Sequence, residues 1–220
     1  MNVQSALKTY AGNRFALLFY VLLIGMGISP LLQPLGVPAG IFEGLLAVTL
    51  VTAALALPRG LLRWTVLVVL AAALAARPGA AWLGHTNVSV ASLGVWGGVA
   101  LLAVASSVRF ALQGREVGAE QIYAALSAYV LAGLCFGLLY WVLEQLAPGS
   151  LSIGGVTGSG DLRIQTTIYF SFVTLASLGY GDILPLSDPA RGLAIIETVG
   201  GQLYLAVLVA RLVSAWRNGE

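Results

Sequence analysis

The sequence predicts an all-α integral membrane protein with six transmembrane helices and one shorter segment that enters the membrane without crossing it. Three observations predict this class. Apolar residues make up 59% of the 220 residues, whereas charged residues make up only 9%. Soluble domains carry about 25% charged residues, because a water-facing surface requires them. The apolar residues also fall into six long runs, and about 20 such residues span the ~30 Å hydrocarbon core of a bilayer.

The six runs follow one another in the chain and are joined at first by short Pro- and Gly-containing connectors. The first run is too long for the apolar part of a cleavable signal, so we expect it to remain as a helix. The third run is short, and an extension past Pro78 to Trp82 would bring it to spanning length. The runs are Phe15–Leu32, Ile41–Leu57, Leu61–Ala76, Val88–Leu112, Ile122–Leu146 and Pro189–Trp216.

Basic residues predict the orientation of these spans. Six spans place both termini on one side, and the positive-inside rule puts the side with more Lys and Arg in the cytoplasm. We therefore expect residues 1–14 to be a cytoplasmic N-terminus and the C-terminus to be cytoplasmic as well. Eight basic residues then lie inside and three outside: Lys8, Arg14, Arg59, Arg63, Arg109, Arg115, Arg211 and Arg217 against Arg77, Arg163 and Arg191.

The connection between the fifth and sixth runs differs from the others. It opens with a Gly- and Ser-rich stretch, Pro148–Gly160, and continues with the apolar segment Ile164–Ser177. About 14 residues are too few to cross a bilayer, so this segment is expected to be re-entrant. Non-helical backbone at membrane depth is tolerated only where it is buried in protein or lines water.

The residues Ser177-Leu178-Gly179-Tyr180-Gly181-Asp182 end the re-entrant segment. Glycine adopts left-handed backbone conformations at little steric cost, so Gly179 and Gly181 allow successive carbonyls to face one axis. Ser177 adds a hydroxyl oxygen at the inner end, while Leu178 and Tyr180 are expected to point away and wedge the strand against the short helix. The C-terminal end of that helix, at about Ala176, carries negative partial charge that favours a cation. One chain supplies only one such strand, which predicts a cyclic homo-oligomer.

This segment resembles the selectivity filter of the potassium-channel superfamily, and the residues from Gly200 to Leu212 resemble its inner helix. The resemblance implies a tetramer that binds K⁺ through Ser177, Leu178, Gly179 and Tyr180, with Gly181 in the same filter and Asp182 at the outer mouth. It also implies a gating hinge at Gly200 or Gly201; close packing of these glycines is the alternative. Ser177 and Leu178 replace the usual Thr and Val, and Val173 stands where some relatives carry a glutamate.

The resemblance divides the chain into a pore domain, residues 122–217, and a peripheral four-helix bundle with its linker, residues 15–121. The fourth helix carries no arginine ladder, because Arg109 and Arg115 sit at its inner end, so a voltage sensor is not expected. We expect passive potassium flux across a bacterial inner membrane, with K⁺ as permeant ion and the lipid bilayer as partner. A weakly selective cation channel and a non-conducting pore-like subunit are the alternatives. The chain offers no soluble ligand-binding domain, and membrane tension, lipid, pH, voltage and a partner protein all stay open as gating stimuli.

Other function classes are not favoured. An intramembrane enzyme would need a nucleophile with a base, and Ser159 between glycines has no His partner in the sequence pattern. A single His, His85, and a single Cys, Cys135, exclude a His/Cys metal cage, and no cofactor is expected. A net charge of +2 is too small for nucleic-acid binding.

The acidic residues are expected in three different settings: within a span, at a helix start and in the outer loops. Glu197 falls within the sixth span, where an acid is a functional candidate, and we expect a structural hydrogen bond behind the filter, toward the short helix. Asp188-Pro189 is expected to be an N-cap followed by Pro at the first helical position. The remaining outer acids are expected to be solvated, where a ring of copies would concentrate cations: Glu144, Asp161 and Asp188.

Overall fold

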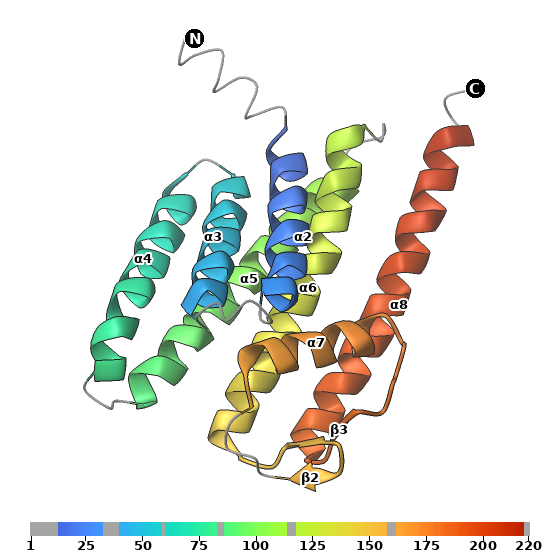
Figure 1. Ribbon diagram of the computed structural model, residues 1–220. Coiled ribbons are helices and arrows are strands. Elements are labelled where there is room, and N and C mark those ends of the chain that lie inside the picture. Colours follow the sequence, from blue (N-terminus) through green and yellow to red (C-terminus); the bar gives the residue numbers. More distant parts are fainter. Residues whose placement is uncertain are drawn as a thin grey trace. The chain divides into compact units, whose positions relative to one another are not determined.

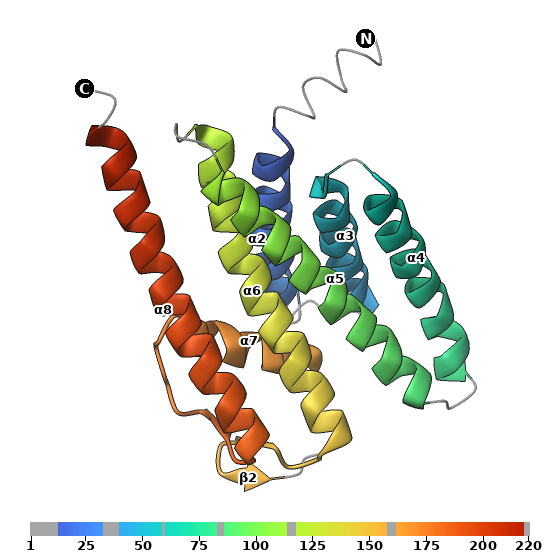
Figure 2. The ribbon, with the colours of Figure 1, turned by 180° about the vertical axis from the view of Figure 1, so that it is seen from behind.

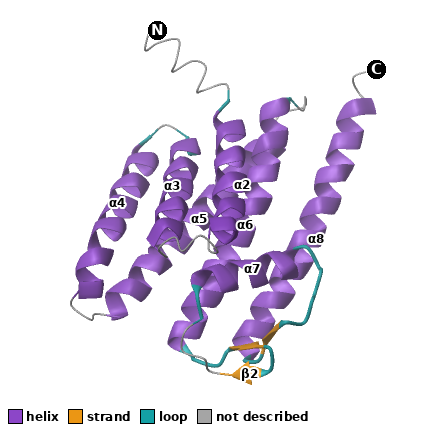
Figure 3. Ribbon diagram, in the orientation of Figure 1, coloured by secondary structure: helices purple, strands orange, loops and turns teal. Residues whose placement is uncertain are grey.

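The computed structural model describes residues 13–32, 40–58, 60–82, 86–113, 118–157 and 162–217. Within them the chain is mostly helical, with three short strands (Figures 1 and 3). His85, Ser159 and Asp161, together with Lys8, Arg59 and Arg115, lie outside the described residues, as does most of the predicted N-terminal segment 1–14.

The long helices coincide with the six apolar runs to within a few residues. α4 continues past Pro78 to Trp82, which is the extension considered from the sequence. The bounds are α2 Arg14–Leu32, α3 Gly40–Ala56, α4 Leu61–Trp82, α5 Thr86–Leu112, α6 Ala119–Leu146 and α8 Asp188–Arg217. The short helix α7, Ile164–Leu175, lies between α6 and α8 in the chain.

Three segments of the described helices are long and apolar enough to cross a membrane: Gly94–Leu112, Ala119–Leu146 and Asp188–Ala215. The described apolar parts of α2, α3 and α4 are shorter than this, between 10 and 17 residues. The structure thus supports a membrane protein with three candidate spans, whereas six spans stay a prediction.

The expectation of an all-α fold is wrong in one region, because the Gly- and Ser-rich stretch contains a hairpin. Strand β1, Leu151–Ile153, pairs antiparallel with β2, Val156–Thr157, and also with β3, Ile183–Pro185, in the order β2-β1-β3. The two turn residues, Gly154 and Gly155, have φ values of 56° and 83°. Left-handed conformation at both positions matches the twist of a two-residue hairpin, and glycine adopts it most readily.

The chain divides into two compact units, and the division into a peripheral bundle and a pore domain at residue 121 stays a prediction. The first unit comprises Met1–Leu74 and Val99–Leu131. In it the rings of Phe15 and Phe110 stack at 4.6 Å with the Arg14 guanidinium over both, and the Phe15 amide donates to Glu120 at 3.2 Å. These contacts join α2 to α5 and to the first turns of α6.

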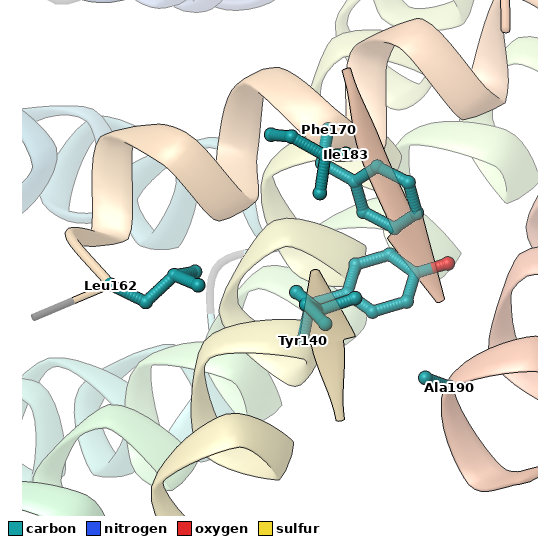
Figure 4. Packing of buried hydrophobic residues seen from close by; sticks show 6 residues of the cluster. Tyr140, Leu162, Phe170, Ile183 and Ala190 are labelled. Carbon is teal, nitrogen blue, oxygen red and sulfur yellow. The ribbon is translucent and has the colours of Figure 1, made fainter. Parts of the chain in front are cut away.

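The second unit comprises Ala75–Gly98 and Ala132–Glu220, and it contains the whole segment singled out from the sequence. Figures 1 and 2 show α7 packed beside the C-terminal half of α6 and the N-terminal half of α8, with the chain returning from α7 to β3. Its core gathers side chains from α6, α7, α8 and the sheet. The rings of Tyr140 and Phe170 meet edge-to-face at 4.8 Å, with Ile183 beside them (Figure 4).

Candidate functional site

The C-terminal end of α7 determines where the segment Ser177–Asp182 begins. The Leu178 amide donates to the Val173 carbonyl and the Ser177 amide to the Thr174 carbonyl, both at 2.9 Å. This pair of bonds is a Schellman motif, which requires a left-handed residue just after the helix. Ser177 is that residue, with φ 57°. A side chain in this conformation costs roughly 1–2 kcal/mol, so the helix end holds Ser177 in a conformation that glycine would adopt more readily.

Left-handed conformations recur at every second residue of the segment. Gly179 has φ 58° and Gly181 has φ 80°, as the sequence analysis expected, and Ser177 adds a third position that it did not foresee. Successive residues of opposite handedness let consecutive carbonyls point to one side of an extended strand. The predicted wedge is absent within one chain, because the side chains of Leu178 and Tyr180 are 56% and 66% exposed.

The inner end of the segment is bonded to α8. The Gln202 side-chain amide donates to the Ser177 hydroxyl oxygen at 2.9 Å, and the Thr198 hydroxyl donates to the Thr174 carbonyl at 3.4 Å. Sequence reasoning assigned no role to Gln202 or Thr198. The signal was present in the sequence, since Thr198 and Gln202 are four positions apart and therefore lie on one face of the helix.

The outer end of the segment is held from two sides. Hydrogen bonding to the Asp182 carboxylate raises the pKa of the Tyr169 hydroxyl above its usual range. The Asp182 carbonyl accepts from the Gly154 amide of the hairpin at 2.9 Å. The Leu186 amide donates to the Ser150 carbonyl at 2.8 Å just beyond β3. Asp182 is therefore placed by α7 and by the sheet together.

Glu197 is fully buried in α8. Its carboxyl oxygens are bonded to the Tyr140 hydroxyl of α6, at 2.9 Å, and to the Ser171 hydroxyl of α7. The Ser171 hydroxyl also lies 2.7 Å from the Gly133 carbonyl. Sequence reasoning pointed from Glu197 toward the short helix but named neither Tyr140 nor Ser171.

Glycines allow the three helices of this site to approach closely. A Cβ atom at Gly137 of α6 would lie 2.7 Å from the Ile168 Cα atom, and one at Gly133 would lie 2.5 Å from the Phe172 ring. On α8, a Cβ atom at Gly201 would lie 2.7 Å from a Leu175 methyl group, whereas one at Gly200 would meet nothing within 4 Å. Close packing therefore accounts for Gly201 and leaves Gly200 without a packing role in one chain.

Two expectations about the acids are wrong. Glu144 is not solvated: it is buried and accepts from the amides of Gly149 and Leu151 at 2.7 and 2.9 Å, which closes the turn after α6. Asp188 does not cap α8. The Ser187 hydroxyl accepts from the Ala190 amide at 3.3 Å, and Asp188 is the first helical residue, bonded at 3.7 Å to Arg191. Serine is as good an N-cap as aspartate, and it leaves the acid in the first turn, where the helix dipole favours it.

The described residues contain no group of three or more His, Cys, Asp and Glu side chains able to hold a metal ion. Apart from the Asp182 carboxylate at its outer end, the Ser177–Asp182 segment offers backbone carbonyls and hydroxyls as oxygen ligands. Such neutral oxygens suit a monovalent cation that sheds its water.

Comparison with known proteins agrees with this geometry. Residues 126–218 match the family model described as Ion channel. Protein LctB of Bacillus caldotenax is 28% identical over 99 residues, which are 44% of this chain and 73% of LctB. Protein LctB of Geobacillus stearothermophilus is 29% identical over 96 residues, 43% of this chain and 71% of that protein.

A plant protein is similar as well. Two pore potassium channel a of Oryza sativa subsp. japonica is 26% identical over 101 residues, 46% of this chain and 28% of the rice protein. The C-terminal part of this chain is therefore similar to ion channels, one of which is a potassium channel by name. The part that matches the ion channel model contains most of α6 and all of α7, the filter-like segment and α8. No solved structure matches the chain.

Proposed function

We propose that this chain is a member of the potassium-channel superfamily and forms a homotetrameric, potassium-selective channel. The supporting observation is the alternation of left-handed residues at Ser177, Gly179 and Gly181, directly after a short helix. Four such strands around one axis would offer stacked rings of carbonyl oxygen to a dehydrated ion. The name of the rice relative is consistent with this ion.

In this proposal the Ser177–Asp182 segment, α7 and α8 each have a role in conduction. Carbonyls of Ser177, Leu178, Gly179 and Tyr180 bind K⁺, Gly181 completes the filter, and Asp182 borders the outer mouth. α8 lines the inner cavity, and the C-terminal end of α7 directs its negative partial charge there. The exposed side chains of Leu178 and Tyr180 would pack against a neighbouring chain, which supplies the wedge that one chain lacks.

The proposal extends to the membrane. All six long helices would span a bacterial inner membrane with both termini in the cytoplasm, and ions would cross passively. Gly200, which has open space around it, is the better candidate for a hinge, since Gly201 is committed to its contact with Leu175.

Reconstitution in liposomes tests this function. We expect potassium-dependent flux from the wild-type protein and a bi-ionic reversal potential that favours potassium over sodium. Gly179→Ala, which places a side chain at φ 58°, should abolish flux, while Gly192→Ala, at an uncrowded helical site, should preserve it. Equal permeability to both ions would instead favour a weakly selective cation channel, for which Ser177 and Leu178 are the sequence basis. Folded wild-type tetramers without flux would indicate a non-conducting subunit.

A further inference from the structure

The buried carboxyl of Glu197 connects three helices of the second unit. It lies in the middle of α8, and both of its hydrogen-bond partners are neutral: Tyr140 of α6 and Ser171 of α7. Among the described residues, the titratable groups that interact with Glu197 are Tyr140 itself and the Cys135 thiol, both on α6. Neither supplies a positive charge that would balance an ionised carboxylate.

The number of protons available in this hydrogen-bond cluster indicates the protonation state of Glu197. The Ser171 hydroxyl oxygen lies at hydrogen-bond distance from two atoms, the Gly133 carbonyl oxygen and the Glu197 Oε1 atom. A serine hydroxyl has one proton to donate, and a backbone carbonyl can only accept. If both contacts are hydrogen bonds, Ser171 donates to Gly133 and the second proton must come from Glu197.

The remaining contact agrees with this assignment. The Tyr140 hydroxyl donates to Glu197 Oε2, the oxygen that stays an acceptor when Oε1 carries the proton. A single chain of hydrogen bonds then runs from the Tyr140 hydroxyl through the Glu197 carboxyl and the Ser171 hydroxyl to the Gly133 carbonyl. Every proton in it is used once, and every buried polar atom in it has a partner.

Burial supports the neutral form. An ionised carboxylate without a positive partner is strongly unfavourable away from water, whereas a fully bonded neutral acid is tolerated. Because this chain of hydrogen bonds begins and ends on α6, it holds α7 at Ser171. The left-handed residue of the Schellman motif, Ser177, follows six residues later.

We infer that Glu197 is a neutral carboxylic acid and a positioning residue, which fixes α7, and through it the Ser177–Asp182 segment, by relaying a hydrogen bond from α6 back to α6. Its effect on conduction rests on the proposed channel function. Its protonation state does not.

The test compares Glu197→Gln with Glu197→Ala in the full-length protein. An amide keeps one donor and one acceptor, so E197Q should retain wild-type thermal stability and wild-type potassium flux. E197A leaves Tyr140 and Ser171 without their partner and should lower the melting temperature and reduce flux at least tenfold. The infrared difference between wild type and E197Q at neutral pH should show the carbonyl band of an un-ionised carboxylic acid.

Three outcomes would overturn the inference. These are a carboxylate band in place of the acid band, loss of flux in E197Q equal to that in E197A, and unchanged stability in E197A. If the infrared band and the stability order appear as expected but the wild-type protein does not conduct, the inference about Glu197 stands and the proposed channel function fails.

Discussion

Two polar side chains from neighbouring helices hold the ends of the Ser177–Asp182 segment. Gln202 of α8 bonds to Ser177 at the inner end, and Tyr169 of α7 bonds to Asp182 at the outer end. An extended strand with three left-handed residues has little regular hydrogen bonding of its own. Its conformation therefore depends on such side-chain contacts.

The bond at the inner end predicts a measurable coupling. Ser177→Ala keeps a Cβ atom, and hence the same backbone preference, but removes the hydroxyl, while Gln202→Leu removes the donor. A double-mutant cycle on thermal unfolding should give a coupling of about 0.5–1.5 kcal/mol, the usual net value of one hydrogen bond. If Q202L lowers stability by the same amount with and without S177A, the bond does not contribute.

The bond at the outer end predicts a pH dependence. Hydrogen bonding to Asp182 raises the pKa of Tyr169, so between the ordinary tyrosine pKa of about 10 and the raised value only the unfolded chain has lost this proton. The stabilisation is therefore complete below about pH 10 and is lost as pH rises through the raised pKa. Wild type should lose stability above about pH 10 more steeply than Tyr169→Phe.

The control for this measurement is Asp182→Asn. It removes the carboxylate that raises the pKa, so the difference in slope between wild type and Y169F should shrink in the D182N background. An unchanged difference in that background would show that Asp182 is not the cause.

At the scale of elements, α7 is packed at glycine positions on both of its neighbours. α6 presents Gly133 and Gly137, four residues apart on one face, and α8 presents Gly201. Small residues at such spacing let helix backbones approach closely. In a membrane this close packing matters because the hydrophobic effect does not drive helices together in lipid, so their association depends on van der Waals contacts. The distance between α7 and its neighbours is thus determined by residues without side chains.

Adjacent glycines on α8 provide a matched test. Gly201→Ala places a methyl group 2.7 Å from the Leu175 side chain and 2.9 Å from the Leu175 carbonyl oxygen, so it should destabilise by about 1–3 kcal/mol. Gly200→Ala meets nothing within 4 Å in one chain and should be neutral or slightly stabilising, since alanine is the better helix former. Unfolding of both variants in detergent measures the difference, and equal stability of the two would contradict the contact with Leu175.

At the scale of the whole molecule, α8 has more apolar surface than a single chain covers. Several of its large apolar side chains are more than half exposed: Ile195, Ile196, Val199, Leu203 and Val207. Some of these face lipid in any membrane protein, but the strand that the proposal places on a shared axis also has two exposed apolar side chains, Leu178 and Tyr180. In the proposed tetramer, other copies of the chain would cover both sets.

Native mass measurement in detergent or lipid nanodiscs tests this requirement. We expect four copies of the 22.8 kDa chain in one particle. Leu203→Glu, which places a charge on the exposed face of α8, should shift the population toward smaller particles, and a substitution on the exposed part of α4, Val68→Glu, is the matched control. A wild-type protein that stays monomeric in lipid would contradict the tetramer.

The sequence by itself determined the long helices, the short helix α7 and the left-handed positions at Gly179 and Gly181. Apolar runs and glycine positions are features of neighbouring residues, so they can be recognised in the sequence without knowledge of the tertiary structure. The hairpin was not predicted from the sequence, although Gly154-Gly155 between Ile153 and Val156 is a turn signal. The strands are only two or three residues long, and they lie in a stretch whose Gly and Ser content is typical of a loop.

The tertiary structure alone decided which polar residues meet. Glu197 pairs with Tyr140 and Ser171 across 57 and 26 positions of the chain, and Gln202 reaches Ser177 across 25. A hydrogen bond depends on the distance between two atoms, and helix packing sets that distance, through glycines whose role appears only when a neighbouring helix lies against them. The same packing buried Glu144 and gave the N-cap of α8 to Ser187, since a side chain's environment follows from what folds over it.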